Sequence, residues 1–211
     1  MATQTHSPTQ TATAPGVQRS GILVRVVVAF GLVAVLSALV GVVLSGASYE
    51  PAPGGLPDAG PIVGWLLPVV GALTFVCAMA TVGWLLLAGF LDPAAGKTTV
   101  SKRGRTALLR ASAAAGIWCI ISLVAAVFKL ASILGIDLGT AVGPSTFITY
   151  AWDIIDVRTL LICALLAAII SVGAAISVSL NGTTVWFGLA VAAVAIPAMA
   201  GHAAGLGDHG L

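Results

Sequence analysis

Long apolar stretches alternate with short polar ones along this chain. Five apolar segments are expected to cross a membrane: residues 22–44, 62–91, 107–136, 158–180 and 184–202. Each is close to or above the about 20 residues that span the hydrocarbon core of a bilayer. Each must be helical, because backbone groups in hydrocarbon have to be satisfied within their own segment. The pattern predicts an all-α, polytopic membrane helix bundle of about five transmembrane helices.

The chain begins with a polar stretch, residues 1–20, that is rich in Thr, Gln, Ala and Pro and has no apolar periodicity. This composition is typical of a disordered tail, which leaves residues 21–211 as the membrane domain. A signal peptide is the alternative interpretation of the first apolar segment, since small residues follow it at 45–47. Its apolar part exceeds the about 7–15 residues of a signal, so we interpret it as a retained helix.

Two prolines fall inside predicted helices. Pro68 is expected to kink the second segment near its start. Pro197, in the last segment, removes one backbone hydrogen bond and should free the carbonyl group of Ala193.

Other local signals concern how neighbouring helices meet. The sequence Asn-Gly-Thr at 181–183 predicts a tight turn between the last two segments. Ser112 and Gly116 lie four residues apart, and small residues at this spacing allow close approach of a neighbouring helix. The five tryptophans fall mostly toward segment ends, as interfacial anchors do.

Composition agrees with a lipid environment. Charged residues make up 8% of the chain and the mean hydropathy is +1.10, whereas soluble domains carry about 25% charged residues. The net charge is only +2, so no nucleic-acid partner is expected. The three cysteines lie inside apolar runs and are poor disulfide candidates.

Charge is distributed unevenly between the two sides of the predicted bundle. Basic residues flank the first segment and fill the loop between the second and third, namely Arg19, Arg25, Lys97, Lys102, Arg103 and Arg105. Acidic residues occupy the loops after the first and third segments, namely Glu50, Asp58, Asp137, Asp153 and Asp156. Because basic loops stay in the cytoplasm, we expect a cytoplasmic N-terminus and an extracytoplasmic C-terminus.

The C-terminal stretch, PAMAGHAAGLGDHGL, holds two of the three histidines. Met199 and His202 are three residues apart and share one face of a helix, and the glycines that follow let Asp208 and His209 fold back toward them. Imidazole and thioether ligands suit copper, particularly Cu(I). The alternative is an ordinary polar helix end, with His202 bonded to a carbonyl group and His209 in solvent.

One basic residue, Lys129, lies inside the third segment, two turns from its outer end. An ionisable residue at such a depth is usually functional or paired, and Asp153 or Asp156 on the adjacent outer loop is the expected partner. Snorkelling toward the outer interface is the alternative.

Sulfur-containing residues near the middle of the helices could form a line of soft metal ligands through the bundle: Cys77, Met79, Cys119 and Cys163. Buried Cys and Met are more often packing residues. The sequence contains neither a Ser/His/Asp constellation nor an HExxH motif, so we expect a protein that is not an enzyme.

Three stretches resemble a known family. The loop GLPDAGP at 55–61, the segment TVGWLLLAGFLDP, and the tail GHAAG followed by Asp208 and His209 are similar to the N-terminal part of CopD-type copper-resistance membrane proteins. The closest form is the actinobacterial one, in which a CopD-like half precedes a CtaG-like half for cytochrome oxidase assembly.

This resemblance implies copper uptake or resistance at the bacterial cytoplasmic membrane, or copper delivery toward cuproprotein assembly. It places His202 and His209 at ligand positions, with Asp208 and Met199 in support. It also implies further transmembrane helices after the tail, so we expect this chain to be an incomplete CopD-like domain that works with such helices or a CtaG-like partner. Two alternatives stay open: a structural subunit of a respiratory or oxidase-assembly complex, and a haem-bearing transmembrane electron carrier.

Overall fold

The computed structural model describes residues 56–92 and 98–205, together with eleven positions between 29 and 54; side chains are described through Pro197. Helices dominate these residues. In chain order they are α2 (Pro61–Leu86), the π-helical turn η1 (Leu87–Leu91), α3 (Lys102–Leu134), α4 (Leu138–Val142), α5 (Pro144–Tyr150), α6 (Ile155–Ile176) and α7 (Leu180–Gly205). The described part of the chain is therefore an all-α bundle, as predicted.

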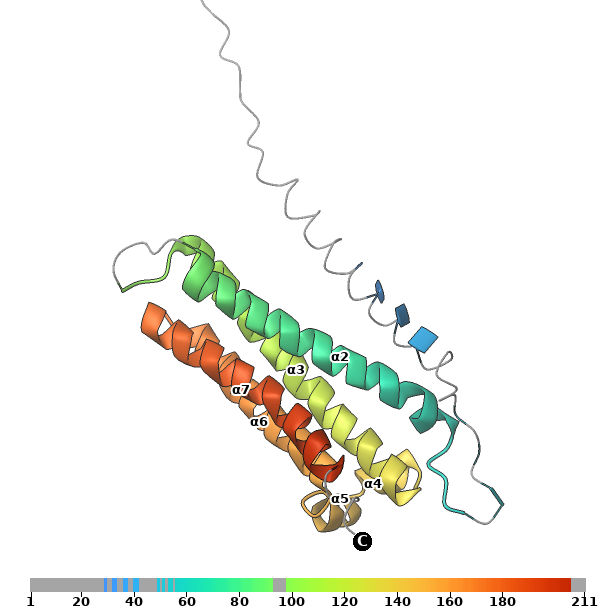
Figure 1. The fold of residues 1–211 in the computed structure, drawn as a ribbon. Coiled ribbons are helices and arrows are strands. Elements are labelled where there is room, and N and C mark those ends of the chain that lie inside the picture. The colour runs from blue at the N-terminus through green and yellow to red at the C-terminus, as the bar shows by residue number, and fades with distance from the viewer. Residues whose placement is uncertain are drawn as a thin grey trace, which may run out of the picture.

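Four of these helical stretches are long and apolar enough to cross a membrane, and they lie side by side (Figure 1). They are α2 with η1, α3, α6, and α7 up to Pro197. They confirm four of the five predicted spans and a multi-pass membrane protein. The first predicted span lies largely outside the described residues and stays a prediction, as does the tail at 1–20.

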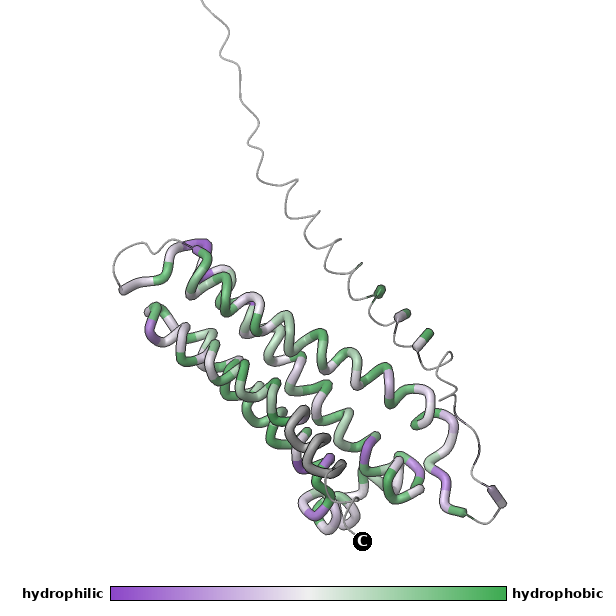
Figure 2. The backbone as a smooth tube through the Cα atoms, in the orientation of Figure 1, coloured by the Kyte–Doolittle hydropathy of each residue, from purple (hydrophilic) through white to green (hydrophobic). Residues whose placement is uncertain are grey.

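The bundle has small residues inside and large ones outside. Alanine dominates the buried set, including Ala111 and Ala115 on α3 and Ala167 on α6, all 0% exposed. Branched aliphatic side chains such as Ile120 on α3 and Val172 on α6 are 63% exposed. Figure 2 shows apolar residues along the whole length of the helices, with polar ones gathered near the two ends. Helices pack this way in lipid, where close approach of backbones, rather than exclusion of water, drives association.

Helices α3 and α6 meet through the predicted small residues. The Ser171 hydroxyl donates to the Ser112 carbonyl oxygen at 2.8 Å. A Cβ atom at Gly116 would lie 3.4 Å from the same hydroxyl oxygen, which is van der Waals contact, so the two helices approach closely here. The expectation that Ser112 and Gly116 admit a neighbouring helix is confirmed.

The connection between α3 and α6 differs from the predicted loop, because it contains the two short helices α4 and α5. Asp137 caps α4: its carboxylate accepts from the Thr140 hydroxyl at 2.6 Å and from the Thr140 backbone N–H at 3.0 Å. These bonds, the hydroxyl one first, lower the pKa of Asp137 below its usual range. Asp156, assigned to the loop from sequence, lies in the first turn of α6.

The turn between the last two spans was placed too late in the sequence. Helix α6 ends at Ile176, and α7 already begins at Leu180, so residues 181–183 are helical rather than a turn. The Ser179 hydroxyl accepts from the Gly182 N–H at 3.1 Å, and this bond starts the helix. The turn lies between Ile176 and Leu180. It is also stabilised by α3, because Arg105 of that helix donates to the Ser177 carbonyl oxygen at 2.9 Å.

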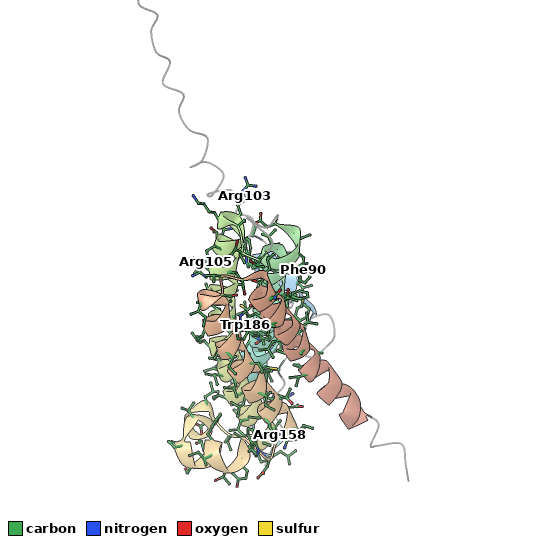
Figure 3. The ribbon with its side chains drawn as sticks, turned by 90° about the vertical axis from the view of Figure 1, so that its left-hand side faces the viewer. Phe90, Arg103, Arg105, Arg158 and Trp186 are labelled. Atoms are coloured by element: carbon green, nitrogen blue, oxygen red, sulfur yellow. The ribbon has the colours of Figure 1, made fainter. Side chains whose placement is uncertain are left out.

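The arginines at the start of α3 and most of the acidic residues lie at opposite ends of the described bundle, as the charge pattern predicts, although Arg158 lies at the acidic end and Asp92 at the basic end. Arg103 and Arg105 lie at the end where α3 begins, and Arg158 lies at the other end (Figure 3). The second end also holds the acidic residues Asp137 and Asp156, at the beginnings of α4 and α6.

Candidate functional site

The predicted metal ligands lie at the end of α7. This helix continues through Pro197 to Gly205, so Met199 and His202 lie on one continuous helical backbone, about one turn apart. The side chains of these two residues lie outside the described part of the structure, as do Asp208 and His209 altogether. The metal prediction at the four residues therefore stays a prediction.

Pro197 has the predicted effect on the helix that carries the tail. The carbonyl oxygen of Ala193, four residues earlier, accepts from the thiol of Cys163 on α6, with Sγ and O 3.5 Å apart. The carbonyl that proline leaves without an intrahelical partner is thus satisfied by a side chain of the next helix. This bond ties α7 to α6 just before the tail begins.

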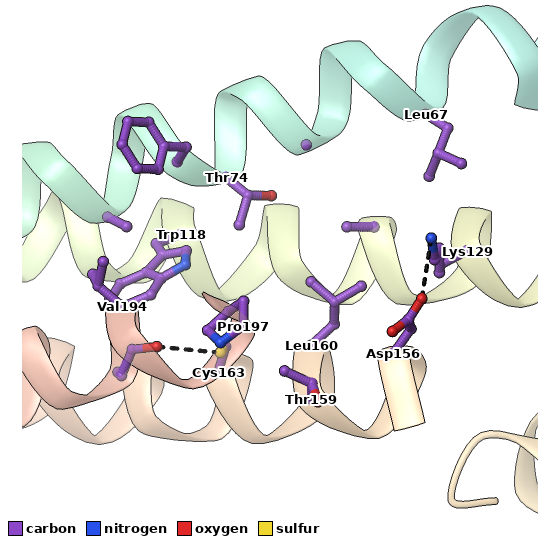
Figure 4. Close-up of a pocket in the computed structure, with 15 residues that line it drawn as sticks. Leu67, Thr74, Trp118, Lys129, Asp156, Thr159, Leu160, Cys163, Val194 and Pro197 are labelled. Carbon is purple, nitrogen blue, oxygen red and sulfur yellow. Dashed lines mark hydrogen bonds and ion pairs between the residues drawn. The ribbon is translucent and has the colours of Figure 1, made fainter. Parts of the chain in front are cut away.

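A cavity of about 510 Å³ lies between α2, α3, α6 and α7, beside this bond (Figure 4). Its lining residues on α3 and α6 are largely buried, among them Trp118 at 2% and Cys163 at 1% exposure. Lining residues on α2 and α7 are mixed: Ala78 and Ala193 are buried, whereas Gly71, Phe75 and Pro197 are exposed. The exposed lining residues lie on α2 and α7, so the cavity opens between these two helices.

One end of the cavity carries an ion pair between α3 and α6. Lys129 Nζ lies 3.1 Å from Asp156 Oδ2 (Figure 4). The predicted pairing of Lys129 is confirmed for Asp156; among the described residues no ion pair joins it to Asp153.

Deeper in the bundle, the cavity wall holds a polar group that sequence reasoning missed. The indole N–H of Trp118 is buried and has no hydrogen-bond partner among the described residues, and neither has the hydroxyl of Ser122 one turn later. Thr74 and Thr159, also in the wall, donate to carbonyl groups of their own helices. Trp118 is the middle residue of α3, unlike tryptophans that anchor a helix at the membrane interface. Its central position in the third apolar segment is the sequence signal that could have identified it as a buried polar group.

The cysteines do not assemble into a metal site. Cys77 and Cys119 pack against the main buried cluster, Cys163 lies in the cavity wall, and Met79 is 40% exposed on the outer surface. Among the described residues, no three His, Cys, Asp or Glu side chains are close enough to share a metal ion.

The tail and the cavity are two separate candidate sites. At about 100° per residue, positions 199 and 202 of α7 fall on the side of the helix away from the cavity-lining positions 193, 194 and 197.

Comparisons with known proteins add no assignment: no family model, no curated protein and no solved structure matches this chain.

The ion pair between Lys129 and Asp156, at one end of the cavity, gives a first testable prediction. The side chains of Lys129 and Asp156 are 36% and 44% exposed, so the attraction is partly screened. We expect a double-mutant cycle of Lys129→Met and Asp156→Asn to give a coupling free energy of about 0.5–1 kcal/mol, measured by unfolding in mixed detergent micelles. The cycle of Lys129→Met with Asp153→Asn is the control and should give no coupling. Equal coupling in both cycles would show that Lys129 is stabilised by the combined negative charge of the acidic end and not by a specific pair with Asp156.

Proposed function

We propose that this chain is a copper-handling protein of the bacterial cytoplasmic membrane, of the CopD type. In this proposal it binds copper at its extracytoplasmic end and passes it across the membrane or toward cuproprotein assembly, without catalytic turnover. Copper is its cargo rather than a resident cofactor. The ligands are His202 and His209, with Met199 and Asp208 in support.

The observation that carries the proposal is the course of α7 beyond Pro197. The helix continues to Gly205, so Met199 and His202 lie about one turn apart on a helical backbone. The glycine-rich sequence that follows offers Asp208 and His209 within a few residues. Soft and borderline ligands of this kind favour Cu(I) over hard cations.

The charge distribution supports an extracytoplasmic position for these ligands. Helix α7 begins at the basic end of the bundle, where its first turn lies beside Thr98 and Arg105, and runs toward the acidic end. Basic ends of membrane bundles face the cytoplasm, which leaves the tail on the outside, where imported copper first arrives.

The surface of α7 supports the involvement of further helices. Position 202 continues the row formed by Val191 and Ala195, two residues that are exposed in the described bundle. We propose that ligands from additional CopD-like helices or from a CtaG-like partner complete the site along this row.

Copper retention tests the proposal directly. The full chain would be purified in detergent, loaded with Cu(I) under reducing conditions and passed through a desalting column. We expect the wild-type protein to retain copper and the double variant His202→Ala/His209→Ala to lose most of it, because both imidazole ligands are gone. Copper per protein is measured by elemental analysis.

Two matched controls exist within the chain. His6→Ala removes the third histidine, and Cys163→Ala removes the thiol nearest to α7; both variants should retain copper as the wild type does. Equal retention by the wild type and the double variant would show that the tail is an ordinary polar helix end, and would favour a structural subunit. A Soret band in the isolated protein would favour the haem-bearing carrier instead.

A further inference from the structure

Arg110 lies exposed on the surface of the bundle and contacts an aromatic ring. Its guanidinium carbon lies 4.8 Å from the centre of the Trp84 ring on the neighbouring helix α2. The side chain is exposed, and within the described residues no carboxylate lies within ion-pair distance of it. Stacking on an aromatic ring leaves the in-plane N–H donors of the guanidinium available for another partner.

Both partners of this contact lie at the same depth. Arg110 is eight residues from the middle of α3, and Trp84 is eight residues from the middle of the span Pro61–Leu91. Eight residues correspond to about 12 Å, and the hydrocarbon core extends about 15 Å from its midplane. The backbone of Arg110 therefore lies just inside the hydrocarbon, and its long side chain reaches the level of the lipid phosphates. The guanidinium therefore lies at the level of the headgroups, without a carboxylate partner among the described residues, where a lipid phosphate can pair with it.

The charged and apolar residues around Arg110 are arranged to match the headgroup and acyl chains of a phospholipid. Arg103, which is also exposed, lies two turns nearer the basic end on the same face of α3. Toward the membrane interior the face continues with Ile117, Ile120 and Val124, which are 51%, 63% and 40% exposed. Cationic groups thus lie above an apolar stripe on one helix face.

We propose that this face binds an anionic phospholipid of the leaflet at the basic end of the bundle. The lipid phosphate accepts hydrogen bonds from the guanidinium of Arg110, which Trp84 holds in place from its flat side. Arg103 provides a second positive charge nearer to the aqueous phase, where the additional negative charge of the headgroup lies. The acyl chains run along Ile117, Ile120 and Val124. Charge complementarity selects an anionic lipid over a zwitterionic one, because basic side chains near the membrane surface attract net negative charge.

The test compares two lipids on the full chain. The protein is stripped of lipid in detergent and titrated with phosphatidylglycerol or phosphatidylcholine, and bound lipid is counted by native mass spectrometry. We expect the wild type to bind phosphatidylglycerol more tightly than phosphatidylcholine. Arg110→Gln should weaken the binding of phosphatidylglycerol about five-fold, the fold-change that corresponds to about 1 kcal/mol for one basic residue near the membrane surface. Arg110→Lys, which keeps the charge and loses the planar fork, should fall between the two.

Arg158→Gln is the matched control, since Arg158 lies at the opposite end of the bundle (Figure 3), and it should bind phosphatidylglycerol as the wild type does. Equal affinity of the wild type for the two lipids would overturn the proposal, and this comparison needs no variant to fold. The proposal is also wrong if Arg110→Gln and Arg110→Lys both bind like the wild type, or if Arg158→Gln weakens binding as much as Arg110→Gln.

Discussion

Replacing Gly135 by alanine is expected to lower the free energy of unfolding by about 2–5 kcal/mol. Gly135 ends α3 in the left-handed conformation, with φ 63° and ψ 35°. An L-residue in that conformation costs about 1–2 kcal/mol. The substitution also adds volume where none is available, because a Cβ atom would lie 2.5 Å from Pro57 Cβ and 2.8 Å from its backbone carbonyl carbon. Overpacking against backbone adds a further about 1–3 kcal/mol.

The measurement is equilibrium unfolding of the purified chain in mixed detergent micelles. Gly83→Ala on α2 is the control, since a Cβ atom there meets nothing within 4 Å, and it should unfold like the wild type. Gly135→Asn separates the two causes, because asparagine tolerates the left-handed conformation but still brings a Cβ atom. If Gly135→Asn is as stable as the wild type, the contact with Pro57 is not tight and backbone strain alone explains the effect.

This contact gives a structural reason for one of the most specific sequence elements. The loop GLPDAGP packs through Pro57 against the end of α3. Its Asp58 carboxylate accepts from the Gly60 N–H at 2.9 Å and from the Tyr49 hydroxyl. The motif therefore locks the start of α2 to the end of α3, only six residues beyond Lys129 and its ion pair. These contacts close the end of the bundle that carries Asp137 and Asp156, independently of any metal.

Much of the architecture was predictable from residue type alone. Length and hydropathy identify four described spans, because lipid requires each crossing segment to be helical and apolar. The partner of Lys129 followed from depth and charge, since a carboxylate on the adjacent outer segment was the nearest compensation. Only one partner of the bond between Cys163 and Ala193 was predicted. Pro197 has no backbone N–H, which identified the free carbonyl group of Ala193, but the donor could not be predicted because it comes from another helix.

Other features depend on information that a uniform apolar pattern does not carry. The turn before α7 was misplaced because apolar residues continue on both sides of Ser177 and Ser179, and only the hydrogen bond of the Ser179 hydroxyl marks the helix start. The short helices α4 and α5 were missed because neither has the length of a span, although Asp137 and Pro144 are recognisable starting residues. The cavity was not predictable at all, since in lipid both faces of a helix are apolar and the packing partners of each face come from tertiary structure.

A second large effect is expected at Gly173 of α6, where Gly173→Ala should lower the free energy of unfolding by about 1–3 kcal/mol. The Trp186 ring of α7 lies directly on this glycine, and a Cβ atom would approach three ring carbons to 2.3, 2.4 and 2.6 Å. The indole is a rigid plane, so either the ring has to rotate about χ1 and χ2 into a less favourable position or α7 has to move away from α6. The same unfolding measurement applies, with Gly188→Ala on α7 as the control, because a Cβ atom there meets nothing within 4 Å. Unchanged stability of Gly173→Ala would mean that Trp186 is not seated on α6 in the membrane.

The same variant also separates the roles of the bundle and of the tail. Displacing α7 stretches the bond between Cys163 and Ala193 and widens the cavity, because both groups lie in its wall. The tail beyond Pro197 keeps its own sequence and helical spacing. If the tail residues hold copper by themselves, Gly173→Ala retains copper at wild-type stoichiometry while it loses stability. If copper retention falls together with stability, the ligands depend on the seating of α7 against α6, and the copper site has to include groups from the bundle.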